Sequence, residues 1–480
     1  MDYTKLGFKA GLEIHQQLDT GKLFSGAPSF LRSDEPHYVI KRKLHAVAGE
    51  SGEVDVAAAH EAAKDKEFYY EGYNDTISLV ELDEEPPHAI NKEALEIGLQ
   101  IALLLNCEPY NVSQVMRKTV IDGSNTGGFQ RTVLIAHRGF LETSFGRVPI
   151  DSVALEEDSA RIVSKGKGKS VYRLDRLGIP LIEISTSPVM MNAEQVKEAA
   201  LKIGEILRAC KVKRGIGTIR QDVNVSIKEH DRVEIKGFQD PSMFVRTIDK
   251  EIARQMEDIK KKKTGGSVRN ALSNGETEFL RPIPGAARMY PETDLPLLKI
   301  GLEQINKIKK NLPKLKGDIR AELRKKGLTE ELISLVLESN EGLDEFTTLA
   351  RVYSKDANLV AKMITLWRAE IASREKKTIN EVKEILTERI LEKLLEAVKE
   401  KKVEIGDVKL VMLKISNGEG FEEAIKIDKI SDDKIEQEIR EIVKEKPGLG
   451  IGGYMGLIIG RLGKDIDKKK AMEILQKVLK

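Results

Sequence analysis

Five short runs in the first half of the chain each combine one apolar face with one face of carboxylate, imidazole and amide groups. In an extended strand, residues i and i+2 point to the same side. In residues 8–18, Phe8 and Leu12 therefore share the apolar side, and Glu13 and His15 share the other. The same alternation gives polar faces to four more runs, with Glu156 and Asp158 in residues 153–158, Glu183 in residues 180–185, Asp222 and Asn224 in residues 221–227, and Glu234 and Lys236 in residues 233–236.

These polar faces indicate either an ordinary half-solvated antiparallel sheet or a metal-dependent site. A solvated face usually mixes lysine, threonine and glutamate, whereas carboxylates predominate here, with one histidine and one lysine. Clustered carboxylates repel one another unless a cation lies among them, and oxygen-rich sites with one imidazole suit Mg²⁺ or Mn²⁺. Magnesium in turn favours a nucleotide phosphate as its co-ligand. We therefore expect phosphate chemistry on this face.

Motifs of other enzyme classes are missing. Residues 164–170, SKGKGKS, end like a phosphate-binding loop, but that loop needs glycine where Val163 stands and a helix afterwards. A strand-like run follows instead, so we interpret the segment as a basic hairpin tip. The chain has no His-Glu-x-x-His, Cys-x-x-Cys or Gly-x-Ser-x-Gly motif, and a zinc or serine hydrolase therefore lacks support.

The pattern of strands and helices along the chain predicts an α+β fold. Residues 1–300 contain short alternating runs, frequent glycine and proline and all 7 histidines, which favours a sheet-rich catalytic domain. Apolar residues at helical spacing predict helices over 90–105 and 193–210, the second capped by Asn192. A basic run followed by Thr-Gly-Gly-Ser indicates a joint near 263–267.

After residue 300 the chain becomes helical and rich in lysine and glutamate. The pattern predicts helices over 329–337, 361–372 and 379–399, within a helical domain of residues 301–405. We expect residues 406–480 to form a small helical tail domain, with helices near 454–462 and 468–479 and a capping Ser431 before an earlier one.

Composition limits the class of protein. The chain has 480 residues, of which 79 are basic and 77 acidic, so no polybasic arm or acidic tail dominates its net charge of +2. Two cysteines, Cys107 and Cys210, are too few for a disulfide framework or a four-thiolate zinc site. No apolar run approaches the roughly 20 residues that span a bilayer, and no signal peptide is visible, so we expect a cytoplasmic protein without membrane contact.

Several long motifs, in order, resemble the B/E subunits of tRNA-dependent amidotransferases. They are GLEIHQQLDTGKLF at residues 11–24, ALEEDS at 154–159, DRLGIPLIEI at 175–184, GTIRQDVNVS at 217–226 and VEIKG at 233–237. The run RPIPGAARMYPETD at 281–294 resembles the archaeal E branch of this family. The resemblance implies a cradle-shaped antiparallel-sheet domain, a helical domain and a tail domain. This agrees with the sheet-rich, helical and tail regions predicted from the sequence pattern.

The resemblance also implies an activity. Glutamate misacylated on tRNA(Gln) would be phosphorylated by ATP on its γ-carboxylate, and ammonia would then displace phosphate to give glutaminyl-tRNA. A carboxylate is a poor acyl donor because oxide is a poor leaving group, and an acyl phosphate removes this obstacle. Such a step needs Mg²⁺ and groups that align the reacting carboxylate.

Site residues follow by resemblance. Glu13, His15 and Glu156 would be the metal ligands, with Glu183 as a further catalytic group near them. The region of ATP and the acyl phosphate would be lined by Arg220, Asp222, Asn224, Glu234 and Lys236. A shielded path for ammonia would pass residues such as Glu157 or Asp158. In the tail, Gly452, Gly453 and Gly456 would either approach the tRNA backbone or serve as helix caps and close-packing positions.

Cofactors and partners are implied in the same way. ATP and Mg²⁺ are expected, and no zinc, because residues 24–54 contain no cysteine where the bacterial B subunits bind zinc. An inserted domain that resembles part of bacterial aspartyl-tRNA synthetases is expected near 263–267 but has no counterpart here. Ammonia would come from a glutaminase subunit, in a hetero-oligomer of paired heterodimers. The alternatives are a non-catalytic tRNA-binding module and a carboxylate-activating ligase that acts on another acceptor.

Overall fold

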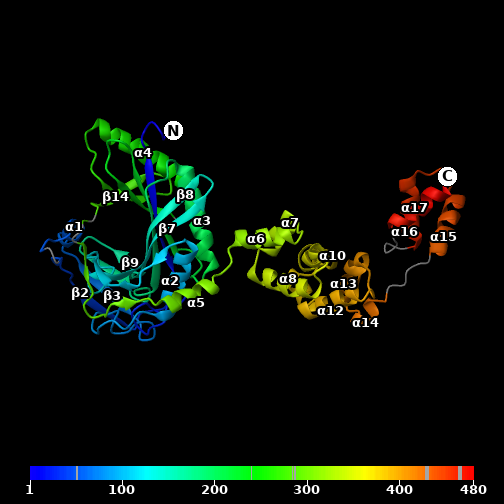
Figure 1. The fold of residues 1–480 in the computed structure, drawn as a ribbon, viewed down its shortest axis with the longest axis horizontal. Helices are drawn as coiled ribbons and strands as arrows, with labels where there is room; N and C mark the ends of the chain where they lie inside the picture. Colours follow the sequence, from blue (N-terminus) through cyan, green and yellow to red (C-terminus); the bar gives the residue numbers. More distant parts are fainter. Residues whose placement is uncertain are drawn as a thin grey trace. The chain divides into compact units, whose positions relative to one another are not determined.

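The computed structural model describes residues 1–49, 52–238, 240–283, 285, 288–426, 432–462 and 468–479. Two compact units make up the chain, Met1–Leu315 and Lys316–Lys480 (Figure 1). The first is a mixture of helices and a large sheet, and the second is helical, so the expected α+β class is confirmed. None of the described helices is long and apolar enough to cross a bilayer.

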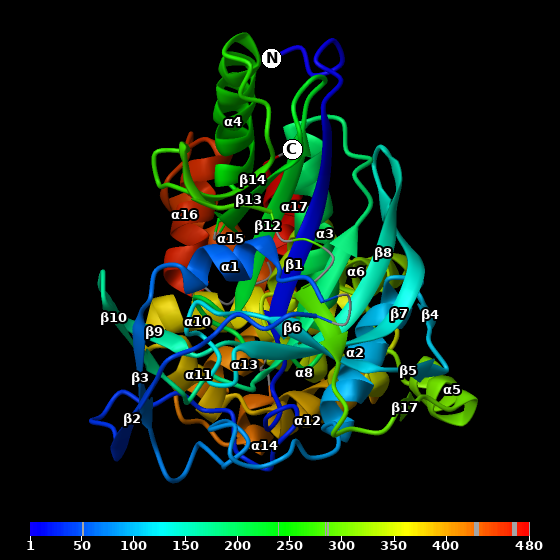
Figure 2. The same cartoon turned by 90° about the vertical axis from the view of Figure 1, so that its left-hand side faces the viewer.

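A large, mostly antiparallel sheet organises the first unit. Its strands occur in the order β15 (Thr277–Arg281), β14 (Ser267–Ala271), β13 (Val233–Phe238), β12 (Ile219–Ser226), β1 (Lys9–Gln17), β11 (Pro180–Thr186), β8 (Gly146–Glu157), β7 (Phe129–Thr143), β6 (Val115–Thr119) and β16 (Met289–Pro291), with β4 (Glu108–Pro109) beside β7. Only the β13–β14 pair among these is parallel. Strand β1 runs through the middle of the sheet (Figure 2).

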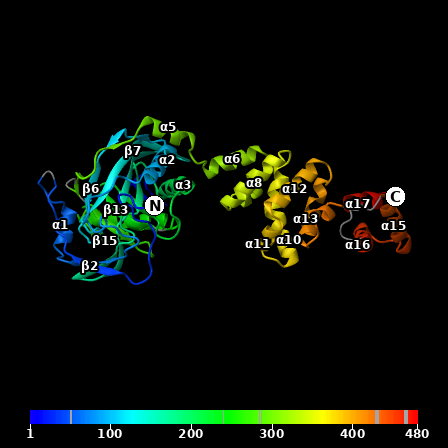
Figure 3. The same cartoon turned by 90° about the horizontal axis from the view of Figure 1, so that it is seen from below.

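Helices cover the apolar face of this sheet. α2 (Lys92–Leu104) and α3 (Ala193–Ala209) pack against strands β1, β7 and β8, on one side of the sheet (Figure 3). Their buried side chains join Leu12 and Ile14 of β1 in one hydrophobic cluster, together with residues of α4 (Met243–Lys260) and α5 (Leu302–Lys310). The Asn192 side chain accepts a hydrogen bond from the Gln195 amide, which confirms the predicted cap of α3.

The opposite face carries the polar residues, in the register that alternation requires. His15 lies opposite Glu183 of β11 and Arg220 of β12, and Glu13 lies opposite Asp222. All five predicted runs are strands of this one sheet, so the polar groups that were expected on separate strands belong to a single surface.

A second, four-stranded sheet contains the basic hairpin. Its order is β2 (Tyr38–Arg42), β3 (Glu67–Gly72), β10 (Lys169–Arg173) and β9 (Arg161–Lys165), over a small core that includes Tyr70 and Tyr172. The amide of Gly166 donates to the Lys169 carbonyl at 2.9 Å and closes a hairpin turn. The segment is therefore a hairpin and not a phosphate-binding loop. A short helix, α1 (Val56–Ala62), and the strand pair β5 (Val112–Ser113) and β17 (Leu298–Lys299) complete the unit.

Helices of the second unit form a hydrophobic cluster that runs from Leu323 to Ala424. They are α6 (Lys316–Lys325), α7 (Glu330–Val336), α8 (Asn340–Val352), α9 (Ala357–Lys362), the π-helix η2 (Met363–Trp367), α10 (Arg368–Glu375), α11 (Ile379–Ile385), α12 (Glu388–Lys399), the 3₁₀-helix η3 (Ile405–Asp407), α13 (Val408–Ser416) and α14 (Phe421–Ala424). The helix predicted over 379–399 is two helices, because the chain turns at the fully buried Leu386 and α12 begins after Thr387.

A separate cluster holds the last three helices, α15 (Asp432–Glu445), α16 (Ile451–Leu462) and α17 (Lys468–Val478). Ile439, Ile458 and Leu475 are fully buried in it. Ser431, the expected cap of α15, lies outside the described residues. The domain limits at residues 300 and 405 and the cradle shape stay predictions.

Candidate active site

His15 is surrounded by three carboxylates from three neighbouring strands. Its Nε2 atom lies 3.5 Å from Glu13 Oε1, 3.5 Å from Glu156 Oε1 and 3.4 Å from Glu183 Oε2. The strand register explains the cluster, since Glu183 is the direct partner of His15 and Glu156 pairs with Leu181, two residues before Glu183. The structure thus brings together all four residues that were expected to be catalytic.

The charges in this cluster shift one another's protonation. Burial alone would lower the pKa of His15, but the hydrogen bond and charge of Glu183, with the charges of Glu156 and Glu13, raise it to about 9. Burial also opposes ionisation of Glu183, yet Lys118 and His15 hold its pKa well below the usual range. Burial and the charge of Glu183 raise the pKa of Glu13. The three carboxylates therefore stabilise the protonated, cationic form of His15.

Lys118 of β6 is a site residue that the sequence reasoning missed. Its Nζ donates to Glu156 Oε2 and lies 3.4 Å from Glu183 Oε2. Gln130 of β7 donates to the other oxygen of Glu156, at 3.0 Å. The signal was weak, because β6 is short and its consecutive Arg117 and Lys118 look like an ordinary solvated edge.

The donor set fits Mg²⁺. Ligand atoms of Glu13, His15 and Glu183 all lie within 4.8 Å of one another, and neighbouring ligands around Mg²⁺ are about 3 Å apart for bonds of about 2.1 Å. Small side-chain rotations would close that difference. Glu156, the third ligand expected from the sequence, lies beside this trio, but Lys118 and Gln130 already use both of its oxygens. Which carboxylates bind the metal stays a prediction.

Two further charged groups flank the cluster on the same face. On one side, Lys236 Nζ lies 2.6 Å from Asp222 Oδ2 and 2.5 Å from Glu234 Oε1. The expected Asn224 lies opposite Glu234, between it and Gly11 of β1. Asp222, Asn224, Glu234 and Lys236 thus lie on β12 and β13, next to β1 and its His15.

On the other side, Asp158 holds the expected Arg220. Arg220 Nη2 donates to Asp158 Oδ1 at 2.7 Å, and Gln17 Nε2 donates to Asp158 Oδ2 at 2.6 Å. Burial opposes ionisation of Asp158, but Arg220 and Arg176 outweigh it and lower the pKa of this carboxyl. Asp158 is therefore an anchor that fixes the position of the Arg220 guanidinium.

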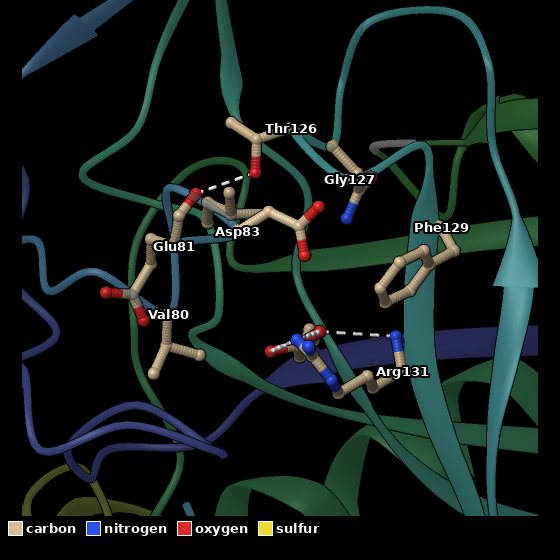
Figure 4. A pocket seen from close by; sticks show the side chains of 10 residues that line it. Val80, Glu81, Asp83, Thr126, Gly127, Phe129 and Arg131 are labelled. Atoms are coloured by element: carbon tan, nitrogen blue, oxygen red, sulfur yellow. Dashed lines mark hydrogen bonds and ion pairs between the residues drawn. The ribbon is translucent and has the colours of Figure 1, made fainter. Parts of the chain in front are cut away.

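A small cavity of about 20 Å³ lies beside Glu157, about the size of one water molecule. Asp83, Phe129 and Arg131 border it (Figure 4). The Arg131 amide donates to Glu157 Oε2 at 3.2 Å, and burial raises the pKa of Glu157 although Arg131 opposes the shift. Because Glu156 and Glu157 are consecutive on β8, they point to opposite faces of that strand.

The three glycines expected to approach tRNA lie in the first half of α16. A Cβ atom added at Gly452 or Gly456 would meet no atom within 4 Å, and one at Gly453 would meet only Leu449, at 3.7 Å. Close packing within the described chain therefore does not require glycine at these positions. The tRNA contact stays a prediction.

Comparison with known proteins supports the resemblance that the motifs suggested. Residues 8–306 match the model of the GatB/GatE catalytic domain. The chain belongs to this family. It is also 34% identical to the E subunit of glutamyl-tRNA(Gln) amidotransferase from Methanocaldococcus jannaschii, over all of this chain and 99% of that protein. The protein of the same name from Pyrococcus horikoshii is 38% identical over 65% of this chain and 71% of its own length.

The GatB/GatE relatives are longer than this chain. The alignment with the M. jannaschii protein has 638 positions and includes all 480 residues, so at least 158 positions (638 less 480) have no counterpart here. All of the residues that surround His15 nevertheless lie inside the matched range 8–306.

Proposed function

We propose that the chain is the transamidase subunit that converts glutamate on tRNA(Gln) to glutamine, by ATP-dependent phosphorylation of the γ-carboxylate and aminolysis by ammonia. The observation that carries this proposal is the cluster of His15, Glu13, Glu156 and Glu183, flanked by Lys118 and Lys236. A cluster of this kind suits phosphoryl transfer, in which positioning and charge neutralisation supply most of the catalysis. The names of the relatives support the substrate.

Each group of residues has a role in this proposal. Glu13, His15 and Glu183, with Glu156 beside them, would hold Mg²⁺, which neutralises phosphate charge when bound. Lys236 and Arg220 would orient the nucleotide and the acyl phosphate from the two sides. Lys118 donates to Glu156 and helps to hold the pKa of Glu183 well below its usual range, so that the Glu183 carboxylate remains available as a ligand.

Ammonia must reach the acyl phosphate unprotonated. The cavity beside Glu157 has the volume of one small polar molecule, and Glu157 lies next in sequence to Glu156 of the cluster. Because Glu157 faces away from the cluster, we place one stage of the ammonia path here, from which ammonia must still pass β8 to reach the acyl phosphate. The chain shows no glutaminase motif of its own, which supports a separate glutaminase subunit, in paired heterodimers, as the source of ammonia.

The remaining proposals concern the tRNA contact, the absent domain and the cellular compartment. α16 and its glycines would approach the tRNA backbone. The segment absent from this chain would be the inserted domain expected near residues 263–267, where α4 is followed directly by β14. A subunit acting on charged tRNA would work in the cytoplasm.

The test uses the purified full chain with Mg²⁺, labelled ATP, tRNA(Gln) charged with glutamate, and ammonium chloride in place of the partner. Formation of glutaminyl-tRNA, and its loss in His15→Ala, would support the proposal. Tight tRNA binding without any ATP turnover would instead indicate a binding module. ATP turnover that ignores glutamyl-tRNA but responds to another carboxylate would indicate a different ligase.

A further inference from the structure

Two arginines of the motif at residues 281–294 reach the active face from opposite edges of the sheet. Arg281 is the last residue of β15 and Arg288 immediately precedes β16. These strands are consecutive in the chain, yet they stand at the two ends of the strand order. The connection between them therefore starts at one edge and finishes at the other, and the Gly285 amide is anchored on the way by Asp55 Oδ1, at 2.8 Å.

Arg281 belongs to the side of the site that contains Lys236. It lies opposite Val268 of β14, which in turn lies opposite Glu234 of β13. Directly paired residues on adjacent strands project to the same face. Burial would raise the pKa of Glu234. The charge of Lys236 outweighs burial and lowers this pKa, and the charge of Arg281 adds to the lowering.

Arg288 belongs to the other side, next to Lys118. Its Nε donates to the Thr119 carbonyl at 3.2 Å, and its neighbour Met289 pairs with Lys118. Its charge acts on Glu156 and Glu234 together. Arg281 and Arg288 thus lie on two sides of the surface between Glu156 and Glu234.

Among the described residues, these two guanidinium groups differ from the other cations of the site because neither forms an ion pair with a carboxylate. Lys118, Lys236 and Arg220 each form an ion pair of 3.4 Å or less. Within the described part of the chain, neither Arg281 nor Arg288 has a carboxylate oxygen within 4.0 Å. Burial and the charge of Arg281 lower the pKa of Arg288, so an anion between the two would relieve an unfavourable charge.

We propose that Arg281 and Arg288 together bind the transferred phosphoryl group, first as the γ-phosphate of ATP and then as the acyl phosphate. This inference rests on the proposed function. In the step concerned, a γ-carboxylate oxygen forms a bond to the γ-phosphorus, the bond from that phosphorus to the bridging oxygen breaks, and ADP leaves with the electron pair. Guanidinium groups suit this task because their forked donors match phosphate oxygens and stay charged.

Phosphate could also come from the tRNA backbone, and the experiment separates the two sources. The variants are Arg281→Gln and Arg288→Gln in the full chain, with Arg147→Gln as a matched control, because Arg147 is exposed and lies in the β7–β8 hairpin. Calorimetry with Mg²⁺ compares ATP and ADP binding without tRNA. We expect the preference for ATP over ADP to fall at least tenfold in both variants and to stay unchanged in the control.

Kinetics provide the second readout. We expect kcat for glutaminyl-tRNA formation to fall by about 10²–10³-fold, with KM for tRNA within twofold, and Arg288→Lys to recover part of the loss. An unchanged ATP preference would overturn the proposal, as would a defect seen only in KM for tRNA, which would assign the arginines to the RNA. If the wild type makes no glutaminyl-tRNA, the proposed function fails, while the ATP preference still decides the role of the arginines. Unfolding temperatures identify a variant that has lost its fold. If Arg288→Gln has done so, the ATP preference and kcat of Arg288→Lys test the proposal instead.

Discussion

The two sets of metal ligands, one expected from the sequence and one grouped by the structure, differ at a single residue. The first contains Glu156 and the second Glu183. Because Lys118 and Gln130 occupy the oxygens of Glu156, we predict that Glu183→Gln weakens Mn²⁺ binding more than tenfold, whereas Glu156→Gln weakens it less than Glu183→Gln does. Electron paramagnetic resonance of free Mn²⁺ measures both. The reverse order would assign the metal to Glu156.

Lys22 offers a pH test outside the site. Its side chain is fully buried, its Nζ has no hydrogen-bond partner among the described residues, and Glu81 Oε2 is 3.8 Å away. Burial lowers its pKa to about 8, although Glu81 opposes the shift. Between pH 8 and the ordinary lysine pKa of about 10.4, the unfolded chain binds the extra proton, so this residue makes stability rise with pH, by at most about 1.4 kcal/mol per unit.

Comparison with Lys22→Met isolates this effect from the other titrating groups. The free energy of unfolding of the wild type, relative to the variant, should increase from pH 8 to pH 10 and stay flat from pH 6 to pH 7. Urea unfolding at each pH gives both values. A difference that is independent of pH would mean that Lys22 is hydrated or paired in solution.

Residue types alone identified only part of the site. Glu13, His15, Glu156 and Glu183 could be predicted because each lies on a strand whose apolar alternation fixes its face, and because the motifs resemble a known family. Lys118 and Gln130 could not, since their importance depends on strand order. Arg281 and Arg288 lie within a motif noticed for its resemblance, but only the pairing of β15 and β16 with strands distant in sequence places them at the site.

At the scale of elements, alternation predicted strands better than periodicity predicted helix ends. The five polar-faced strands are present because a buried sheet face fixes the register of each one. A helical pattern rich in lysine and glutamate cannot show a turn such as the one at Leu386, where burial of one leucine and the extended backbone of Thr387 interrupt an otherwise regular repeat. That turn depends on tertiary packing.

Gly139 tests how tightly the elements of the first unit pack. A Cβ atom there would lie 2.6 Å from the Leu105 carbonyl oxygen and would collide with Cys107 Sγ. We predict that Gly139→Ala destabilises the fold by about 1–3 kcal/mol, because neither backbone nor buried thiol can move freely. Gly26→Ala is the control, since its Cβ meets nothing within 4 Å. Thermal unfolding compares the two, and equal midpoints would show that β7 and α2 pack loosely.

At the scale of the whole molecule, the catalytic chemistry is confined to one unit. His15 with the carboxylates around it, and all of the residues proposed to contact ATP or the acyl phosphate, lie within Met1–Leu315, which has its own hydrophobic core. We predict that residues 1–315 fold alone and bind Mn²⁺ as the full chain does, but that KM for glutamyl-tRNA rises at least tenfold, because the proposed tRNA contact in α16 is removed. Unchanged KM would place tRNA recognition in the first unit.

In the proposed reaction, the γ-carboxylate of tRNA-bound glutamate becomes an acyl phosphate on this chain. Hydroxylamine tests it most directly, because it captures an acyl phosphate as a stable hydroxamate. The full chain would be incubated with Mg²⁺, ATP, glutamyl-tRNA(Gln) and hydroxylamine, without ammonia. Chromatography would then separate glutamate γ-hydroxamate from the α-hydroxamate that hydroxylamine forms directly from the aminoacyl ester. We predict glutamate γ-hydroxamate that depends on ATP and is absent with His15→Ala. ATP hydrolysis without γ-hydroxamate, or γ-hydroxamate formed equally by His15→Ala, would exclude an acyl phosphate made at this site.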